Sequence, residues 1–310
     1  MSILLLETLH ADAEALLSAH DALMHAADPN APSGDLSAVR AILTRGRGRI
    51  DEPLMERCTS LRVIARAGAG LDNLDTAAAR RRNVVVIFAP GANTDTVAEH
   101  TLALILDLVR GISRSAAQVA AGRWEDRAHY SGNEVRGLVL GIVGFGHIGR
   151  RTAALGAAFG MRIVVATHRG LSVPAPYESL PLDELLTAAD VVSLHMPLTA
   201  ATRACIGARQ LARMKPSAYL INTARGALID PSALRDALTH GRIAGFAADV
   251  LDVEPPAADD PLLRSERVLL TPHVASLTAA TYRTICVETA TNVLAVLRGT
   301  TPAVHSVFAR

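Results

Sequence analysis

The sequence has almost no excess of positive or negative charge. Its 31 lysines and arginines nearly balance its 30 aspartates and glutamates, which leaves a net charge of +1. A surface that binds nucleic acid or an anionic membrane needs a basic excess, so the charge balance argues against both as partners. Lysine itself is almost absent, since Lys215 is the only one. We attribute this scarcity to the base composition of the genome and not to function.

Cysteines and long apolar runs are also scarce. The 3 cysteines are far apart, odd in number and without the spacing of metal ligands, so we predict reduced core thiols and no metal site. No apolar run reaches the length that spans a membrane, and no basic segment precedes the short apolar run at the N-terminus. We therefore expect a soluble cytoplasmic protein of 310 residues with about two domains.

The most informative pattern that is present joins a strand, three glycines and a helix. The apolar run 138–143 predicts a buried strand, and it leads into glycines at 144, 146 and 149 with the spacing G-x-G-x-x-G. Such glycines allow a tight turn, a close approach to a pyrophosphate and close packing of helix on strand. The helix predicted over 150–159 offers its N-terminus to phosphate. We interpret the pattern as a dinucleotide site, with a purely structural turn as the alternative.

Strands and helices alternate through the rest of the chain, which predicts an α/β protein. A first parallel sheet is expected without a glycine pattern, from strands at 2–6, 41–44, 61–65 and 84–88. A single long helix over 94–121 should then lead to the second sheet. The further strands of that sheet are expected at 162–166, 191–194, 219–222, 244–248 and 268–270. A last helix is expected over 278–297.

Polar side chains follow three neighbouring strands in the second half of the chain. Arg225, Glu254 and His273 come after the strands that end at 222, 248 and 270. Ligands of open α/β sheets bind at the carboxyl ends of the strands. A guanidinium binds a carboxylate bidentately, and a histidine beside a carboxylate suits proton donation to a carbonyl oxygen. Each residue alone is typical of a loop, but together with a dinucleotide site they predict reduction of a 2-keto acid.

Over essentially its whole length the sequence resembles the D-isomer-specific 2-hydroxyacid dehydrogenase family. Seven stretches carry the resemblance in the family's order: 67–75, 93–100, 144–149, 195–199, 223–226, 249–255 and 272–273. The resemblance implies two Rossmann-like domains with parallel sheets. These are a flavodoxin-like substrate domain, made of 1–93 and 276–310, and a dinucleotide-binding domain over 94–275. It also implies a homodimer formed through the cofactor domain.

The same resemblance implies roles for single residues. Arg225 would bind the substrate carboxylate, His273 would act as acid and base, and Glu254 would pair with His273. The backbone at Ala69 and Gly70 would hold the substrate. Cofactor contacts are expected from Thr96, Gly144, Phe145, Gly146, His147, Ile148, Thr167, His168, Arg169, His195, Met196, Pro197, Thr202, Thr223, Ala224, Asp249 and Ser276.

The chain departs from the NAD-using members of the family after the predicted strand 162–166. Those members carry an acidic residue there for the ribose hydroxyls, whereas this chain has Thr167, His168 and Arg169. An arginine suits a 2′-phosphate, so we predict NADP as the preferred cofactor, with NAD as the alternative. This pattern is most similar to glyoxylate/hydroxypyruvate reductases, which makes a small 2-keto acid the expected substrate.

Two alternatives stay open. Arg45 and Arg66 resemble arginines that bind the distal anion in 3-phosphoglycerate dehydrogenases, although no regulatory domain follows residue 310. The substrate would then be a 2-hydroxy acid with a second anionic group. A solvated basic loop is the plainer interpretation of Arg45 and its neighbours. In another class, corepressor-like scaffolds of the same fold sense nucleotides, but the sequence lacks the charged or disordered extensions that would recruit partners.

Overall fold

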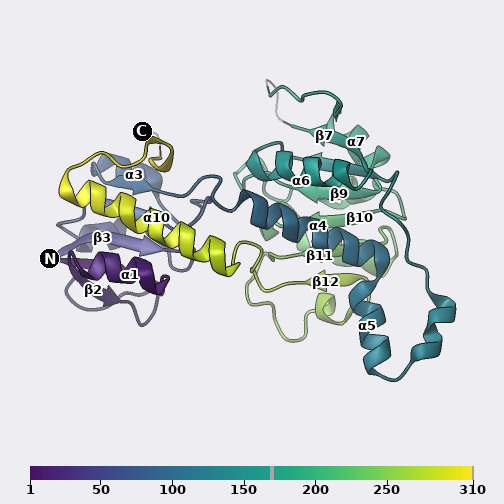
Figure 1. Cartoon of the computed structure of the whole chain (residues 1–310), viewed down its shortest axis with the longest axis horizontal. Coiled ribbons are helices and arrows are strands. Elements are labelled where there is room, and N and C mark those ends of the chain that lie inside the picture. Colours follow the sequence, from purple (N-terminus) through teal and green to yellow (C-terminus); the bar gives the residue numbers. More distant parts are fainter. Residues whose placement is uncertain (168–170, 309–310) are drawn as a thin grey trace. The chain divides into compact units, whose positions relative to one another are not determined.

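The computed structural model describes residues 1–167 and 171–308. The chain forms two compact units, of which the first is Met1–Asn93 with Ser276–Arg310 and the second is Thr94–Ala275. Each unit contains one parallel sheet with helices on both faces (Figure 1). The predicted α/β class with two parallel sheets is therefore confirmed.

The first unit has a five-stranded sheet in the order β2-β1-β3-β4-β5, which is the flavodoxin-like order. Its strands are β1 (Ser2–Leu5), β2 (Ala22–His25), β3 (Val39–Thr44), β4 (Val63–Arg66) and β5 (Val85–Ile87). Strand β2 was not predicted from the sequence. It lies at the sheet edge and contains no buried residue, so its hydrophobic pattern gives no signal.

Both faces of this sheet are buried because nearly all consecutive residues of its central strands are apolar. The helices of the unit are α1 (Ala11–Ser18), α2 (Glu52–Arg57), α3 (Thr76–Arg81) and α10 (Ala279–Arg298). Ile3 and Leu5 of β1 face a core shared with α1 and α10, whereas Leu4 faces a core shared with α2 and α3. Helices α1 and α10 lie side by side in Figure 1. The last helix of the chain thus completes the unit that the first strand begins.

The second unit has a seven-stranded parallel sheet in the order β12-β11-β10-β9-β6-β7-β8. Its strands are β6 (Val139–Val143), β7 (Arg162–Ala166), β8 (Glu178–Ser179), β9 (Val191–Leu194), β10 (Tyr219–Asn222), β11 (Gly245–Ala248) and β12 (Val268–Leu270). The chain builds outward from β6 to β8 and then continues on the other side of β6 with β9. The strand order reverses between β6 and β9, and such a reversal is where open α/β sheets bind ligands.

The helices of the second unit divide between the two faces of the sheet. They are α4 (Thr94–Arg110), α5 (Ile112–Ala120), α6 (His147–Ala158), α7 (Leu182–Ala188), α8 (Ala208–Leu211) and α9 (Pro231–Thr239). Ile105 of α4 and Ala153 of α6 pack on one face. Leu185 of α7 and Leu234 of α9 pack on the other. Helix α6 begins at His147, earlier than the predicted start, so the last two glycine-loop positions before Gly149 are already helical.

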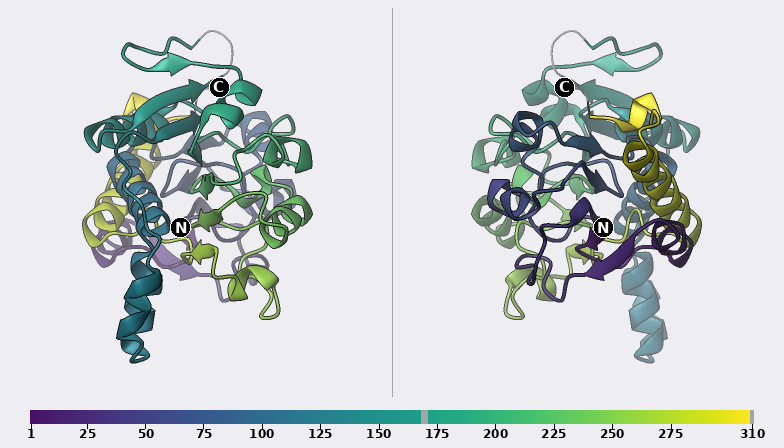
Figure 2. Two further views of the ribbon diagram at one scale, coloured as in Figure 1. Left: turned by 90° about the vertical axis from the view of Figure 1, so that its right-hand side faces the viewer. Right: turned by 90° about the vertical axis from the view of Figure 1, so that its left-hand side faces the viewer.

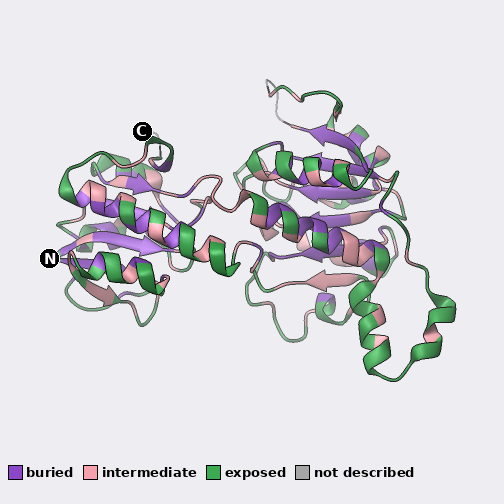
Figure 3. Ribbon diagram, viewed as in Figure 1, coloured by how far each residue is buried: buried purple, intermediate pink, exposed green. Residues whose placement is uncertain are grey.

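The single helix predicted over 94–121 is wrong. Gly111 has φ +62, a left-handed conformation that ends α4, and α5 starts directly after it. The Asp107 carboxylate accepts a hydrogen bond of 2.7 Å from the Ser113 N–H, which fixes the new start. Helix α5 has no buried residue and projects from the body of its unit (Figures 2 and 3). No helix within residues 1–167 and 171–308 is long and apolar enough to cross a membrane.

Candidate functional site

His273 and Glu254 form the central pair of the site. They follow β12 and β11, which are adjacent strands, and His273 Nδ1 lies 2.8 Å from Glu254 Oε2. The other oxygen, Glu254 Oε1, accepts a 2.9 Å bond from the Leu251 N–H. Burial alone would raise the pKa of Glu254. The bonds from His273 and Leu251, together with the charges of His273 and Arg225, outweigh burial and hold that pKa below its usual value. Glu254 is therefore a carboxylate at neutral pH, and it leaves the Nε2 edge of a half-exposed imidazole for a substrate.

Arg225 lies close to this pair. It follows β10, the next strand of the sheet, and its charge contributes to the lowered pKa of Glu254. A Cβ on the neighbouring Gly226 would lie 1.9 Å from the carbonyl carbon of Leu251, so only glycine lets these two loops approach. Asn222 holds the Arg225 loop, since its side chain donates to the Arg225 carbonyl and accepts from the Ala224 N–H. The structure thus brings together the three residues that the sequence predicts as catalytic.

Asp249 holds the loop that carries His273. Its carboxylate is buried and accepts hydrogen bonds from the Thr271 hydroxyl (2.5 Å) and from the N–H groups of Val274 (2.9 Å) and Ala275 (2.8 Å). His273 lies between these anchors with φ +56, which is unusual for a residue with a side chain. The predicted cofactor role of Asp249 stays a prediction, whereas its hydrogen bonds within the protein give it a structural one.

The three glycines of the loop between β6 and α6 are needed for different reasons. A Cβ at Gly144, which has φ +97, would lie 2.7 Å from the His195 backbone, and one at Gly149 would lie 2.2 Å from the Gly144 carbonyl oxygen. Packing therefore explains both of these glycines. A Cβ at Gly146 would meet nothing within 4 Å. The remaining physical reason for glycine there is the close approach of a ligand to the start of α6, so the loop fits a dinucleotide.

Replacing Gly146 by alanine is expected to weaken nucleotide binding at least about tenfold while the free energy of unfolding stays within about 0.5 kcal/mol of wild type. Its φ of −78 is open to alanine, and the new methyl group enters the space of the ligand and not of the protein. Gly149→Ala is the contrasting variant, because its methyl group overlaps the backbone and should cost about 1–3 kcal/mol of stability. Nucleotide titration and urea unfolding measure both effects. Equal nucleotide affinity in Gly146→Ala and wild type contradicts the assignment.

The end of β7 also suits a ligand. The Thr167 hydroxyl is buried and has no hydrogen-bond partner among residues 1–167 and 171–308. An orphaned hydroxyl at this strand end fits a polar ligand group such as a ribose. The predicted contacts His168 and Arg169 lie outside the described residues.

His195 follows β9, on the other side of β6. Its Nε2 lies 2.9 Å from the Ser193 hydroxyl, and burial lowers the pKa of His195 to about 3. The residue as a whole is partly buried. The next residues form a compact turn in which the Thr202 hydroxyl donates to the Pro197 carbonyl at 2.7 Å. The predicted cofactor residues of this segment thus border Gly144 at the point where the strand order reverses.

A buried neutral imidazole makes stability depend on pH. In the unfolded chain His195 binds a proton below its ordinary pKa of 6.5, whereas in the fold it does so only near pH 3. The wild type should therefore lose stability relative to His195→Asn as the pH falls below about 6.5, by up to about 1.4 kcal/mol per pH unit. Above that pH the two stabilities should run parallel. Urea unfolding of both proteins at pH 7, 6 and 5 measures this, and parallel behaviour across the whole range contradicts a neutral buried ring.

The other predicted cofactor residues occupy several elements. Thr96 lies in the first turn of α4, and Thr223 and Ala224 follow β10. His147 and Ile148 begin α6, and Phe145 is buried with the Arg150 guanidinium 4.7 Å from its ring centre. Met196 packs beside Cys205. Ser276 belongs to the first unit.

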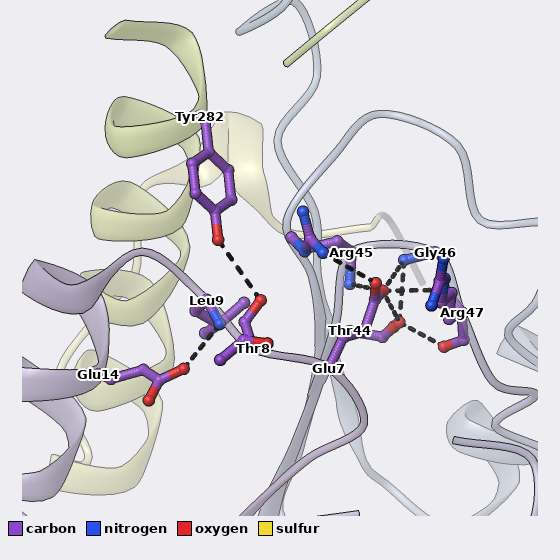
Figure 4. A network of polar contacts seen from close by, with 9 residues as sticks. All are labelled: Glu7, Thr8, Leu9, Glu14, Thr44, Arg45, Gly46, Arg47 and Tyr282. Carbon is purple, nitrogen blue, oxygen red and sulfur yellow. Dashed lines mark hydrogen bonds and ion pairs between the residues drawn. The ribbon is translucent and has the colours of Figure 1, made fainter. Parts of the chain in front are cut away.

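In the first unit, the basic loop after β3 surrounds a carboxylate of the protein itself (Figure 4). Glu7 Oε1 accepts from the N–H groups of Arg45 (2.7 Å), Gly46 (2.6 Å) and Arg47 (2.9 Å) and from the Thr44 hydroxyl (3.0 Å). Burial alone would raise the pKa of Glu7. The backbone bonds from Arg47 and Arg45, the Arg45 charge and the Thr44 bond outweigh it and lower that pKa.

Arg45 is held on two sides. Its guanidinium lies 3.3 Å from Glu7 Oε2 and 5.2 Å from the centre of the Tyr282 ring. Arg66 donates to the carbonyl of Gly70, so two predicted substrate-binding residues touch each other, with Ala69 between them in the chain. Glu7 and Tyr282 were not among the predicted site residues. A carboxylate directly after the predicted strand 2–6 is the one signal that could have pointed to Glu7.

Among the described residues, no group of three or more His, Cys, Asp or Glu side chains could hold a metal ion.

The chain is similar to several known proteins. A sequence model described as "D-isomer specific 2-hydroxyacid dehydrogenase, NAD binding domain" matches residues 102–275. A hydroxypyruvate reductase of Thermotoga maritima is 36% identical over 252 residues, which is 81% of this chain and 82% of the relative. An (S)-sulfolactate dehydrogenase of Chromohalobacter salexigens is 40% identical over 246 residues, 78% of this chain and 79% of the relative.

The chain is also similar to longer relatives and to a solved structure. The D-3-phosphoglycerate dehydrogenase of Bacillus subtilis is 37% identical over 270 residues, which is 86% of this chain but 51% of the relative. The chain thus spans about half the length of the phosphoglycerate dehydrogenases that it matches. The crystal structure of a Thermus thermophilus protein superposes with a TM-score of 0.91 at 36% identity, covering 100% of both chains.

Proposed function

The chain belongs to the D-isomer-specific 2-hydroxyacid dehydrogenase family. We therefore propose that it is an oxidoreductase that reduces a small 2-keto acid, such as glyoxylate or hydroxypyruvate, to the 2-hydroxy acid. The observation that carries the proposal is the 2.8 Å contact of His273 with Glu254 at strand ends close to Arg225. The glycine loop in the same unit supports a dinucleotide as the second reactant.

In the proposed reaction each residue has a separate task. Arg225 binds the substrate carboxylate through parallel N–H···O bonds, which orients the keto group. His273 donates the proton on Nε2 to the carbonyl oxygen. Glu254, ionised at neutral pH, stabilises the imidazolium before that transfer and fixes the ring through Nδ1. A bound nicotinamide cofactor supplies the hydride. In the reverse direction neutral His273 accepts the hydroxyl proton.

We propose NADP as the preferred cofactor. Support comes from the sequence at the end of β7, where Thr167 offers a hydroxyl and no acidic residue stands in the segment 167–169. The test is reduction of hydroxypyruvate with NADPH and NADH side by side. A preference for NADPH supports the proposal. A clear preference for NADH contradicts the cofactor assignment while leaving the reaction class in place.

A 2-hydroxy acid with a second anionic group is the alternative substrate. Arg45 and Arg66 favour it, and so do the relatives named for sulfolactate and phosphoglycerate. Against it, the Glu7 carboxylate already occupies the N–H groups of the basic loop and pairs with Arg45. Oxidation of 3-phosphoglycerate or sulfolactate at higher kcat/KM than glycerate would establish the alternative. A nucleotide-sensing scaffold would instead bind the nucleotide without measurable turnover of any of these acids.

We further propose a homodimer in which a second copy covers α5 and the segment after it. Ile112 and Val119 lie one heptad apart on one face of α5 and are 56% and 53% exposed, and Trp124 is 59% exposed. Apolar side chains on a projecting helix are typical of a subunit contact. Sedimentation velocity should give a dimer for wild type and a monomer for the double variant Ile112→Glu, Val119→Glu. A wild-type monomer contradicts the proposal.

A cytoplasmic location also stays a proposal. It is supported by the thiols of Cys58, Cys205 and Cys286, none of which is in a disulfide. Burial raises the pKa of Cys58 to about 11, which keeps that thiol protonated and unreactive. Free thiols are typical of a reducing compartment.

A further inference from the structure

Two consecutive residues of helix α4 each reach a different loop of the proposed catalytic site. We propose that Thr101 and His100 are positioning residues, Thr101 for the carboxylate-binding Arg225 and His100 for the acid/base His273. This inference rests on the proposed function, because it assigns how two residues of that reaction are held. Neither Thr101 nor His100 was among the predicted site residues, although His100 ends the stretch 93–100 that carries the resemblance.

Thr101 holds the loop after β10. Its side chain is fully buried, and its hydroxyl donates to the Val97 carbonyl at 2.7 Å. With its single hydrogen used there, the Thr101 oxygen accepts from the Thr223 hydroxyl, 2.8 Å away. Thr223 stands two residues before Arg225. Asn222 fixes the backbone on both sides of Ala224, so the loop has two anchors, one in the sheet and one on α4.

His100 holds the loop after β12. The Thr271 hydroxyl donates to Asp249 at 2.5 Å, so its oxygen has to accept the hydrogen bond from His100 Nε2 at 3.0 Å. This network assigns the Nε2–H form of His100. Nε2 also lies 3.7 Å from the Asp249 carboxylate, which favours the same donor orientation. Thr271 stands two residues before His273, whose φ of +56 depends on these anchors.

Helix α4 carries both anchoring residues, Thr101 and His100, next to each other. Adjacent Cα atoms are separated by about 3.8 Å, and α4 packs against both β10 and β11. The separation of Thr223 and Thr271 is therefore set by two adjacent residues of a rigid helix, independently of the loops themselves. A displacement of about 1 Å at a reacting group costs up to about 100-fold in rate, so loosening either anchor should be measurable.

The experiment uses two pairs of variants in the full chain, assayed with hydroxypyruvate. Thr101→Val removes one hydroxyl at nearly constant volume and should raise KM about tenfold with a smaller change in kcat, whereas Thr101→Ser should restore the wild-type KM. His100→Leu should lower kcat about tenfold with KM within about twofold, and His100→Gln, which keeps a terminal N–H donor, should recover most of the rate. Thr187→Val is the matched control, since Thr187 of α7 also bonds the carbonyl four residues earlier, and it should leave both constants unchanged.

The outcomes separate this inference from the proposed function. The positioning roles are supported if the wild type turns over substrate, Thr101→Val mainly raises KM and His100→Leu mainly lowers kcat. The unfolding midpoint and the NADPH affinity of both variants should then equal those of wild type. Wild-type turnover with variants that match wild type overturns them and leaves the proposed function standing. Loss of activity in proportion to lost stability, or without recovery in the Ser and Gln variants, overturns them as well. A wild type without turnover refutes the proposed function itself.

Discussion

His273→Ala is expected to lose about 10²- to 10⁴-fold in kcat with hydroxypyruvate, because general acid catalysis by a positioned side chain is typically worth that much. The imidazole is the one group in the described site that is paired with a carboxylate on Nδ1 and left half exposed on its other edge. Without it, the developing alkoxide has to take its proton from water. Steady-state rates with saturating NADPH measure the effect, and nucleotide affinity should stay within about twofold because the glycine loop is untouched.

Glu254→Gln serves as the graded comparison for this prediction. The amide keeps an oxygen for the Leu251 N–H but lacks the negative charge that stabilises the imidazolium. Its kcat should fall less than in His273→Ala, because the imidazole stays in place but the imidazolium loses the negative charge beside Nδ1. A rate in His273→Ala equal to wild type excludes His273 as the acid. A kcat in Glu254→Gln equal to that of wild type excludes the proposed role of the carboxylate.

Arg225→Lys is expected to lower kcat/KM for hydroxypyruvate by about 10- to 100-fold, with KM raised and kcat reduced. Lysine keeps the positive charge but presents it as a point, so the two parallel bonds to the substrate carboxylate become one. One charge-assisted hydrogen bond is worth about 1.5–3 kcal/mol, which corresponds to this range of rates. The loss of orientation lowers kcat in addition to affinity.

A matched substitution controls for the general effect of replacing arginine. Arg242 pairs with Asp236 at the exposed end of α9, and Arg242→Lys should leave kcat/KM unchanged. The charge of Arg225 also helps to lower the pKa of Glu254. Because Arg225→Lys retains this charge, the pKa of Glu254 should stay lowered while substrate binding weakens. Equal kcat/KM in Arg225→Lys and wild type contradicts bidentate binding at this residue.

The fold class and the order of the two sheets could be predicted from the amino-acid sequence alone. Strands such as Arg162–Ala166, Val191–Leu194 and Tyr219–Asn222 have the predicted bounds, because strands buried on both faces are read directly from continuous apolar runs. The glycine pattern after β6 also depends only on local backbone needs. Strand-end residues such as Arg225 and His273 were predictable because the carboxyl ends of parallel strands meet at one edge of the sheet.

Tertiary structure decided what depends on contacts between distant residues. The helix predicted over 94–121 is broken at Gly111, since α5 leaves the core and a left-handed glycine costs little there. The edge strand β2 forms by pairing with β1, although its own side chains give no buried pattern. Glu7 accepts hydrogen bonds from the basic loop after β3, and residues of α4 hydrogen-bond to Thr223 and Thr271. Both sets of bonds join residues that are far apart in sequence. Local pattern specifies a residue's own backbone, whereas the partner of a buried polar group is fixed only when the packed chain brings the two together.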